Sequence, residues 1–274
     1  MEINVNGTTI WYEKTGAGEP LILLHGNGES HGIFSEAIPL LAERFTVYAT
    51  DTRGHGKSAP AGVFHYTDMA EDTAAFIGAL ALEKPAVYGF SDGGITALLL
   101  ALRYPDLPSR IAVSGANLRP GGLTRAFLKD SRRGYRKTQD PLTKLMLTEP
   151  HISLRDLKKI RVPVLVTAGE HDLVRERHTL RIARALPCGT LKIFAGETHE
   201  SYIGNSTKCV PAVFSFLSGR KSVRRNAVRF SRLFFAENKF SVLFVHDDGL
   251  ARRYAAAEHL FGERVFDAAA HRTL

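Results

Sequence analysis

The chain has 274 residues, of which 44% are hydrophobic and 23% charged, and this composition excludes a disordered, collagen-like or disulfide-scaffold protein. The formal net charge of +8 is concentrated in two blocks. Residues 117–150 hold 8 basic and 3 acidic side chains, and residues 220–274 hold 11 and 6. Two separate basic blocks do not match the continuous basic stripe of a nucleic-acid-binding protein. The simpler interpretation is that the basic side chains of both blocks lie on faces exposed to water. A protein contact through residues 220–274 stays open.

Two cysteines, Cys188 and Cys209, are too few for a disulfide framework, so we expect free buried thiols in a reducing compartment. The first 14 residues lack the basic region and apolar run of a signal peptide. The longest apolar stretch, residues 97–102, is too short to cross a bilayer. We therefore expect a cytoplasmic protein that binds neither a membrane nor nucleic acid.

Strand and helix signals alternate over the first 116 residues. The predicted strands are residues 10–13, at a sheet edge, and residues 21–24, 45–50, 85–88 and 111–114. The predicted helices are residues 33–44, residues 66–82 with Thr67 as N-cap, and the apolar, buried residues 94–104. Because strands and helices alternate, the sequence predicts an α/β fold whose mainly parallel sheet is covered on both faces.

The alternation is interrupted by residues 117–150, a basic segment with no clear strand that we interpret as an inserted cap. It resumes with a strand at residues 164–168 and a helix near residues 175–186. A strand at residues 191–194 and a closing helix near residues 208–217 follow. We therefore expect one α/β domain over residues 1–219, with the cap inserted into it.

The most informative motif is Gly89-Phe90-Ser91-Asp92-Gly93, which lies between a predicted strand and a predicted helix. In this context the pattern G-x-S-x-G forms a sharp turn that exposes the serine at the top of the sheet. Side chains at positions 89 and 93 would collide with the neighbouring strand and helix. The alternative is a serine in an ordinary turn, which the strand and helix on either side disfavour.

A serine hydroxyl is a weak nucleophile, so it needs a base, and the base needs an acid that orients it. Asp172 and His199 each follow a predicted strand, in the order that a Ser-acid-His series requires after such a turn. We predict that Ser91 attacks, His199 transfers the proton and Asp172 orients His199. The rival residues near these positions are Glu170, His171, His178 and Glu197, and both rival histidines are expected at the surface.

His25-Gly26-Asn27-Gly28 follows the strand at residues 21–24, where such folds supply part of an oxyanion hole. We predict that the backbone N–H groups of Asn27 and Asp92 bind the oxyanion, although a simple turn would explain the glycines too. Phe34, Phe90, and the cap residues Phe127 and Leu128 are candidates for the lining of an acyl pocket. A role in the hydrophobic core is the alternative for each of these four.

Together, the serine turn, the His-Gly-Asn-Gly loop, the loop at residues 51–58 and the Asp172/His199 pair resemble the α/β-hydrolase superfamily over residues 1–219. The resemblance implies the α/β-hydrolase fold and requires no metal or cofactor. It also implies that residues 51–58 are structural, so Arg53 and His55 receive no catalytic role. The predicted function is hydrolysis of a small carboxylic ester through an acyl-enzyme. A C–C hydrolase, a cofactor-free perhydrolase and a ligand-binding receptor that retains the three residues are the alternatives.

Residues 89–116 are also similar to the esterase branch that includes valacyclovir hydrolase, through the run Ser-Asp-Gly-Gly-Ile-Thr-Ala-Leu. The resemblance implies that Asp92 can hold a substrate ammonium group, which would favour amino-acid esters. Alternatively, Asp92 pairs with a nearby arginine or caps the following helix. The basic cap favours anionic substrates instead, unless its charges face water.

The tail beyond residue 219 exceeds what a hydrolase of this type needs. We predict a basic linker at residues 220–239, a strand at residues 240–245 and a helix at residues 251–261. Residues 242–253 resemble the first strand and phosphate loop of low-molecular-weight phosphatases and arsenate reductases. Arg252 matches that pattern, but His246 stands where the reactive cysteine is required. We therefore interpret residues 240–274 as a degenerate appendage.

Overall fold

The computed structural model describes residues 1–219, 240–245 and 251–256, and it contains an eight-stranded sheet with the order β1-β2-β4-β3-β5-β6-β7-β8. The strands are β1 (Glu2–Val5), β2 (Thr8–Thr15), β3 (Glu19–Leu24), β4 (Phe45–Thr50), β5 (Ala86–Phe90), β6 (Arg110–Ser114), β7 (Val164–His171) and β8 (Gly189–Thr198). β2 is antiparallel to β1 and β4, and the remaining neighbours are parallel. The predicted α/β fold with a mainly parallel sheet is confirmed.

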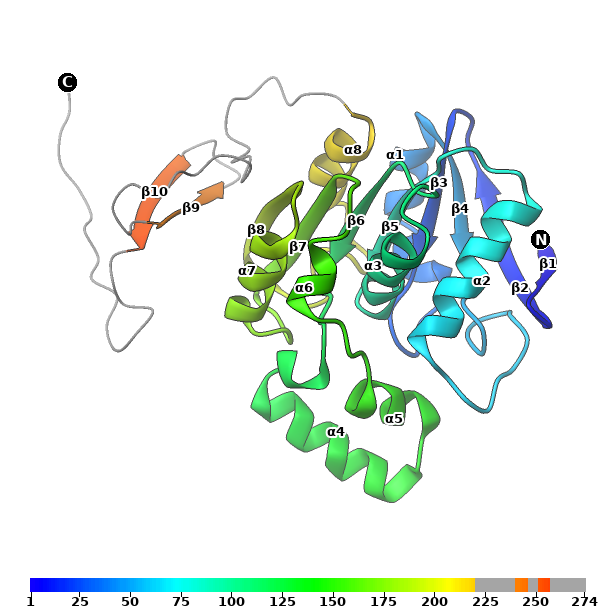
Figure 1. Ribbon diagram of the computed structural model, residues 1–274, viewed down its shortest axis with the longest axis horizontal. Coiled ribbons are helices and arrows are strands. Elements are labelled where there is room, and N and C mark those ends of the chain that lie inside the picture. Colours follow the sequence, from blue (N-terminus) through cyan, green and yellow to red (C-terminus); the bar gives the residue numbers. More distant parts are fainter. Residues whose placement is uncertain (220–239, 246–250, 257–274) are drawn as a thin grey trace.

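Helices cover both faces of the sheet (Figure 1). α1 (Ala37–Ala42) and α8 (Val210–Leu217) lie on one face, and α2 (Tyr66–Ala79), α3 (Asp92–Arg103), α6 (Leu154–Leu157) and α7 (Glu176–Ala185) lie on the other. Side chains of β3 alternate between the two hydrophobic cores: Ile22 and Leu24 contact one core, and Leu21 and Leu23 the other. β3 is therefore apolar throughout because both of its faces are buried.

Three predicted elements need correction at the N-terminal side of the sheet. The strand at residues 10–13 is not an edge strand, because β1 pairs outside it through a turn at Asn6-Gly7, where both residues have positive φ. The helix predicted at residues 33–44 is divided into η1 (His31–Phe34) and α1. Pro39 has no N–H, so it cannot donate the backbone hydrogen bond that would join α1 to the preceding turn. α2 begins at Tyr66, with His65 rather than Thr67 at the N-cap position.

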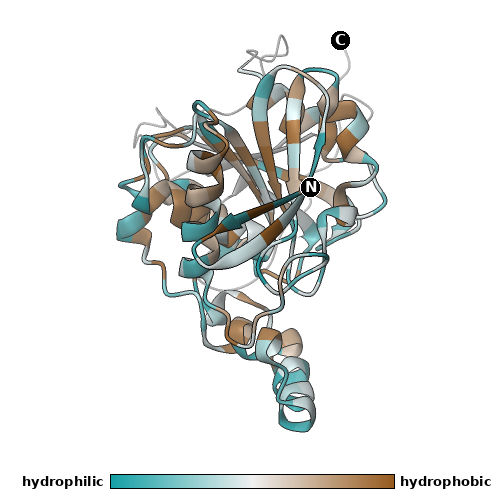
Figure 2. Ribbon diagram, turned by 90° about the vertical axis from the view of Figure 1, so that its right-hand side faces the viewer, coloured by the Kyte–Doolittle hydropathy of each residue, from teal (hydrophilic) through white to brown (hydrophobic). Residues whose placement is uncertain are grey.

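The cap segment, residues 117–150, contains η2 (Pro120–Gly122), α4 (Arg125–Thr138) and α5 (Pro141–Thr148). α4 buries none of its residues and projects from the sheet, and most of its ribbon has hydrophilic colours in Figure 2. All eight basic side chains of the segment are exposed: Arg119, Arg125, Lys129, Arg132, Arg133, Arg136, Lys137 and Lys144. Their charges therefore face water.

In the tail, β9 (Phe240–Val245) confirms the predicted strand. Residues 251–256 form β10 (Ala251–Ala256), antiparallel to β9, so the helix predicted there is wrong over these residues. His246 and the linker at residues 220–239 lie outside the described residues.

The two thiols differ, because Cys209 is buried whereas Cys188 is exposed, contrary to the expectation that both are buried. Within the part of the chain that the structure describes, no helix is both long enough and apolar enough to span a membrane.

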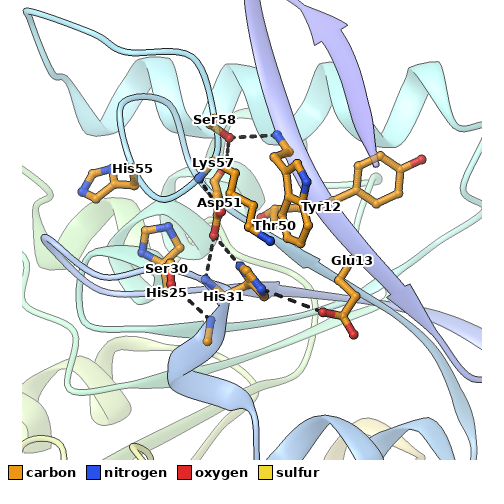
Figure 3. Close-up of polar contacts among 12 residues, drawn as sticks. Tyr12, Glu13, His25, Ser30, His31, Thr50, Asp51, His55, Lys57 and Ser58 are labelled. Carbon is orange, nitrogen blue, oxygen red and sulfur yellow. Dashed lines mark hydrogen bonds and ion pairs between the residues drawn. The ribbon is translucent and has the colours of Figure 1, made fainter.

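The loop at residues 51–58 is held by the buried carboxylate of Asp51 (Figure 3). Asp51 Oδ1 accepts hydrogen bonds from His31 N at 2.7 Å and His31 Nδ1 at 2.8 Å, and Oδ2 accepts one from Lys57 N at 2.8 Å. Burial opposes ionisation of Asp51, but these hydrogen bonds outweigh it and lower the pKa of the carboxyl. Asp51 thus joins the loop after β4 to the start of η1, as expected of a structural loop.

We expect Asp51→Ala to lower the free energy of unfolding by about 3 kcal/mol, because the N–H groups of His31 and Lys57 lose the buried carboxylate that accepts their hydrogen bonds. Urea unfolding at neutral pH measures the change. The matched control is Asp130→Ala, which removes an exposed carboxylate of α4 and should change stability by no more than about 0.5 kcal/mol. Equal effects of the two substitutions would contradict the structural role.

Candidate active site

Ser91 lies on a strained turn between β5 and α3, with φ 51° and ψ −112°. The turn is possible because the residues two positions before and two positions after Ser91 are glycines. A β-carbon on Gly89 would lie 2.1 Å from the carbonyl oxygen of Gly93, and one on Gly93 would lie 2.0 Å from that of Leu24. Ser91 N donates a hydrogen bond to Ser114 O at 2.8 Å, which fixes the turn against β6. The predicted geometry of the serine turn is present.

Ser91, His199 and Asp172 form a hydrogen-bonded series. Ser91 Oγ lies 3.0 Å from His199 Nε2, and His199 Nδ1 lies 2.7 Å from Asp172 Oδ1. Asp172 also accepts hydrogen bonds from Gly169 N at 3.2 Å and Val174 N at 2.9 Å. Because Asp172 is the acceptor, the proton of a neutral imidazole belongs on Nδ1, which leaves Nε2 free to accept the serine proton.

The space for His199 depends on β6. A β-carbon on Gly115, which follows β6, would lie 2.6 Å from His199 Cε1. Phe90 contacts the other side of the imidazole, with ring centroids 5.0 Å apart. These two residues set the position of the ring between Ser91 and Asp172.

The rival residues lie elsewhere. Glu170 is exposed and accepts a hydrogen bond from Gly196 N, while Glu197 binds Ser201 Oγ and Lys208 Nζ. His171 is exposed as expected. His178 is buried, contrary to expectation, and its Nε2 accepts a hydrogen bond from Leu118 N at 3.0 Å. Burial, with nearby arginines, lowers the pKa of His178 to about 4, so it remains neutral as a structural acceptor.

The oxyanion loop, residues 25–29, passes close to the serine. A β-carbon on Gly26 would lie only 3.2 Å from Ser91 Cβ, so the backbone approaches the nucleophile because this residue is glycine. Asn27 Nδ2 donates to Asp92 Oδ2 at 2.8 Å and to Leu142 O at 3.3 Å. Asp92 is the first residue of α3. The side-chain bond between Asn27 and Asp92 thus ties together the two residues whose backbone N–H groups we predicted as oxyanion donors.

Asp92 is buried and engaged on both oxygens. Tyr66 Oη donates to Oδ1 at 2.7 Å, in addition to the bond from Asn27. Burial raises the pKa of Asp92, and these two hydrogen bonds partly offset the effect. The side chain of Asp92 does not pair with an arginine, because its partners are the neutral groups of Tyr66 and Asn27. It does not cap the following helix either, because Ser91 is the N-cap residue of α3. Tyr66 was missed because nothing in its local sequence indicates a partner 26 residues away.

A cavity of about 240 Å³ opens onto this group of residues. Its lining residues are Asn27, Glu29, Tyr66, Phe90, Ser91, Asp92, Asn117, Leu123, Phe127, Met146, Leu173 and His199. The predicted lining residues Phe90 and Phe127 are among them, whereas Leu128 is not. Phe34 is a correction, because it is fully buried in the core with its ring 5.5 Å from that of Tyr88. None of the described residues that line the cavity is a lysine or an arginine.

The described residues contain no cluster of three or more His, Cys, Asp and Glu side chains suited to a metal ion.

Comparisons with known proteins agree with the fold. Residues 19–140 match the model of the alpha/beta hydrolase fold family. The human serine hydrolase BPHL is 28% identical over 204 residues, which cover 62% of this chain and 69% of that protein. Among solved structures, a meta-cleavage product hydrolase (CumD) of Pseudomonas fluorescens is similar, with a TM-score of 0.68 at 20% identity over 80% of this chain and 97% of that one. The carboxylesterase CesB of Bacillus subtilis has a TM-score of 0.69 at 22% identity, over 80% and 91%.

The chain is therefore a serine hydrolase with the α/β-hydrolase fold. A hydrolase of this kind acts on a small-molecule substrate, which fits the size of the cavity.

Proposed function

We propose that the protein hydrolyses small carboxylic esters through an acyl-enzyme formed on Ser91. The observation that carries this proposal is the hydrogen-bonded series from Ser91 through His199 to Asp172, of which Ser91 and His199 line a cavity of about 240 Å³. Such a series activates a hydroxyl for attack on a carbonyl carbon.

In the proposed reaction, Ser91 Oγ attacks the ester carbonyl while His199 Nε2 takes its proton. The tetrahedral oxyanion is bound by the backbone N–H groups of Asn27 and Asp92. Its collapse expels the alcohol, which receives the proton from His199 and leaves an acyl ester on Ser91. Water then attacks this ester with His199 as base, and the carboxylic acid is released. Asp172 stabilises the imidazolium that forms in both halves of the reaction.

The charges around the cavity support an ester that carries an amino group. The buried carboxyl group of Asp92 lines the cavity, and no described lysine or arginine does, while the basic side chains of the cap segment are exposed. A carboxylate in a partly desolvated cavity attracts a cation strongly. Similarity to the human serine hydrolase BPHL and the resemblance to the valacyclovir hydrolase branch agree with an amino-acid ester. A C–C hydrolase for an anionic acid would need a cationic partner in this lining.

The test compares phenylalanine methyl ester with its N-acetyl derivative, which lacks the cation, in wild type and in Asp92→Asn. We expect wild type to prefer the free amine, and Asp92→Asn to reduce the ratio of the two kcat/KM values by about tenfold or more. Asp68→Asn, which removes an exposed carboxylate of α2, should leave the ratio unchanged. A folded wild type that turns over neither ester would contradict the esterase proposal. Turnover without preference would contradict only the amino-ester assignment.

A further inference from the structure

Glu29 is an ionisable group of the cavity to which the proposed mechanism gives no role. Its Oε2 accepts a hydrogen bond from Gly26 N at 2.8 Å, and Glu29 N in turn donates to Gly26 O at 3.4 Å. A β-carbon on Gly26 would lie 2.7 Å from Glu29 Oε2 and 3.2 Å from Ser91 Cβ. Glu29 Oε2 and Ser91 Cβ therefore both lie on the side of Gly26 that a β-carbon would occupy, so the carboxyl of Glu29 is close to the side chain of Ser91.

We propose that Glu29 is a positioning residue of the oxyanion loop and that it serves the reaction in its neutral, protonated form. This inference rests on the proposed function, because it concerns the oxyanion of the same reaction. Gly26 directly precedes Asn27, whose N–H is the proposed oxyanion donor. The loop is thus held on one side by the carboxyl of Glu29 and on the other by the bond from Asn27 Nδ2 to Asp92. These two anchors fix the direction of the intervening peptide N–H.

The protonation state matters because the carboxyl lies next to the place where negative charge develops. An ionised Glu29 would repel the oxyanion in a site that is partly shielded from water. A protonated carboxyl still has a carbonyl oxygen that accepts the hydrogen bond from Gly26 N, so it retains the anchor without the negative charge. The neutral form therefore meets both requirements.

The surroundings of Glu29 favour that neutral form near neutral pH. Burial raises the pKa of Glu29 to about 7, and the carboxylates of Glu200 and Asp92 act in the same direction. The hydrogen bond from Gly26 N and the nearby His199 act in the opposite direction. These groups come from the loop after β8, from the start of α3 and from the oxyanion loop itself. Glu29 is thus neutral below about pH 7 and ionised above it.

The experiment is the pH dependence of kcat/KM for p-nitrophenyl acetate, with Ser91→Ala giving the background rate at each pH. For wild type we expect kcat/KM to be about tenfold lower at about pH 8.5 than at about pH 6.5, because Glu29 ionises between them. Glu29→Gln retains a carbonyl oxygen for Gly26 N but cannot ionise, so its activity should not decline at high pH. Glu29→Ala loses the anchor, so its kcat should fall about tenfold or more at every pH, with KM changed much less.

Two further variants separate this role from a general effect on structure. Glu200→Gln removes a carboxylate that favours the neutral form, so the decline should begin at lower pH than in wild type. Glu43→Gln removes an exposed carboxylate at the end of α1 and should leave the profile unchanged. Thermal melting of each variant reports whether it is folded.

Two results would overturn the inference. One is a Glu29→Gln variant that is folded and declines at high pH as wild type does. The other is a Glu29→Gln variant that loses its rate at all pH values, which would mean that the ionised form is the useful one. Failure of the proposed function has a different signature, namely a Ser91→Ala variant that turns over the ester as fast as wild type.

Discussion

Replacing Ser91 with alanine should lower kcat for ester hydrolysis by about 10⁴-fold or more, because it removes the atom that forms the acyl-enzyme. His199→Ala should cost about as much, since no other described group lies within hydrogen-bond distance of Ser91 Oγ to take its proton. The double variant should be no slower than either single variant, because the two residues act as one unit. Initial rates for the three variants, with burst-phase kinetics for wild type, measure these effects.

The control for this prediction is the stability of the variants. Alanine keeps the backbone conformation of position 91, so the melting temperature of Ser91→Ala should remain within a few degrees of wild type. Ser131→Ala on α4, which does not line the cavity, should leave kcat unchanged. Retention of more than about 1% of wild-type kcat in folded Ser91→Ala would contradict the assignment of the nucleophile.

The substitution Gly93→Ala should lower the free energy of unfolding by at least about 4 kcal/mol or prevent soluble expression. Its β-carbon would lie 2.0 Å from the carbonyl oxygen of Leu24, an atom of the central strand β3 that cannot move aside cheaply. Gly89→Ala should behave in the same way, because its β-carbon would lie 2.1 Å from the carbonyl oxygen of Gly93. Urea unfolding gives the free energies where the variants are soluble.

Gly78→Ala is the matched control for both substitutions. Gly78 lies within α2, and a β-carbon there would meet no atom within 4 Å. Alanine is the better helix former, so this variant should be more stable by about 0.5–1 kcal/mol. A Gly93→Ala variant with wild-type stability would show that the turn around Ser91 is wider than the structure has it.

Much of the sheet could be predicted from local sequence, because apolar runs identify buried strands. The strand predicted at residues 45–50 has the bounds of β4, and the helix after the serine turn was expected to be buried. The edge strand β1 was missed because half of its residues are polar, although the Asn6-Gly7 turn was a signal for a hairpin. Residues 251–256 show the limit of local propensity, since an alanine-rich segment with a helical composition pairs as a strand with β9.

The site residues that could be predicted are those that directly follow a strand and occur in the order serine, acid, histidine along the chain. Ser91, Asp172 and His199 each follow a strand, and the parallel sheet brings the ends of those strands to one edge. The partners of Asp92 were not predictable, since the bond from Tyr66 depends on how α2 packs beside α3. Phe34 was misplaced because an aromatic residue in an amphipathic segment does not reveal which face it occupies.

The distribution of charge has a kinetic consequence for substrate selection. The cap segment places its positive side chains in water, whereas the cavity holds carboxyl groups. A cationic ester approaching past α4 is therefore repelled before it is attracted. At 0.1 M salt the Debye length is about 10 Å, so salt weakens the repulsion between the cap segment and a distant cationic ester. Salt weakens the attraction to a buried carboxyl group much less. We therefore expect the proposed preference for a cation to arise from slow dissociation of the bound ester rather than from fast association.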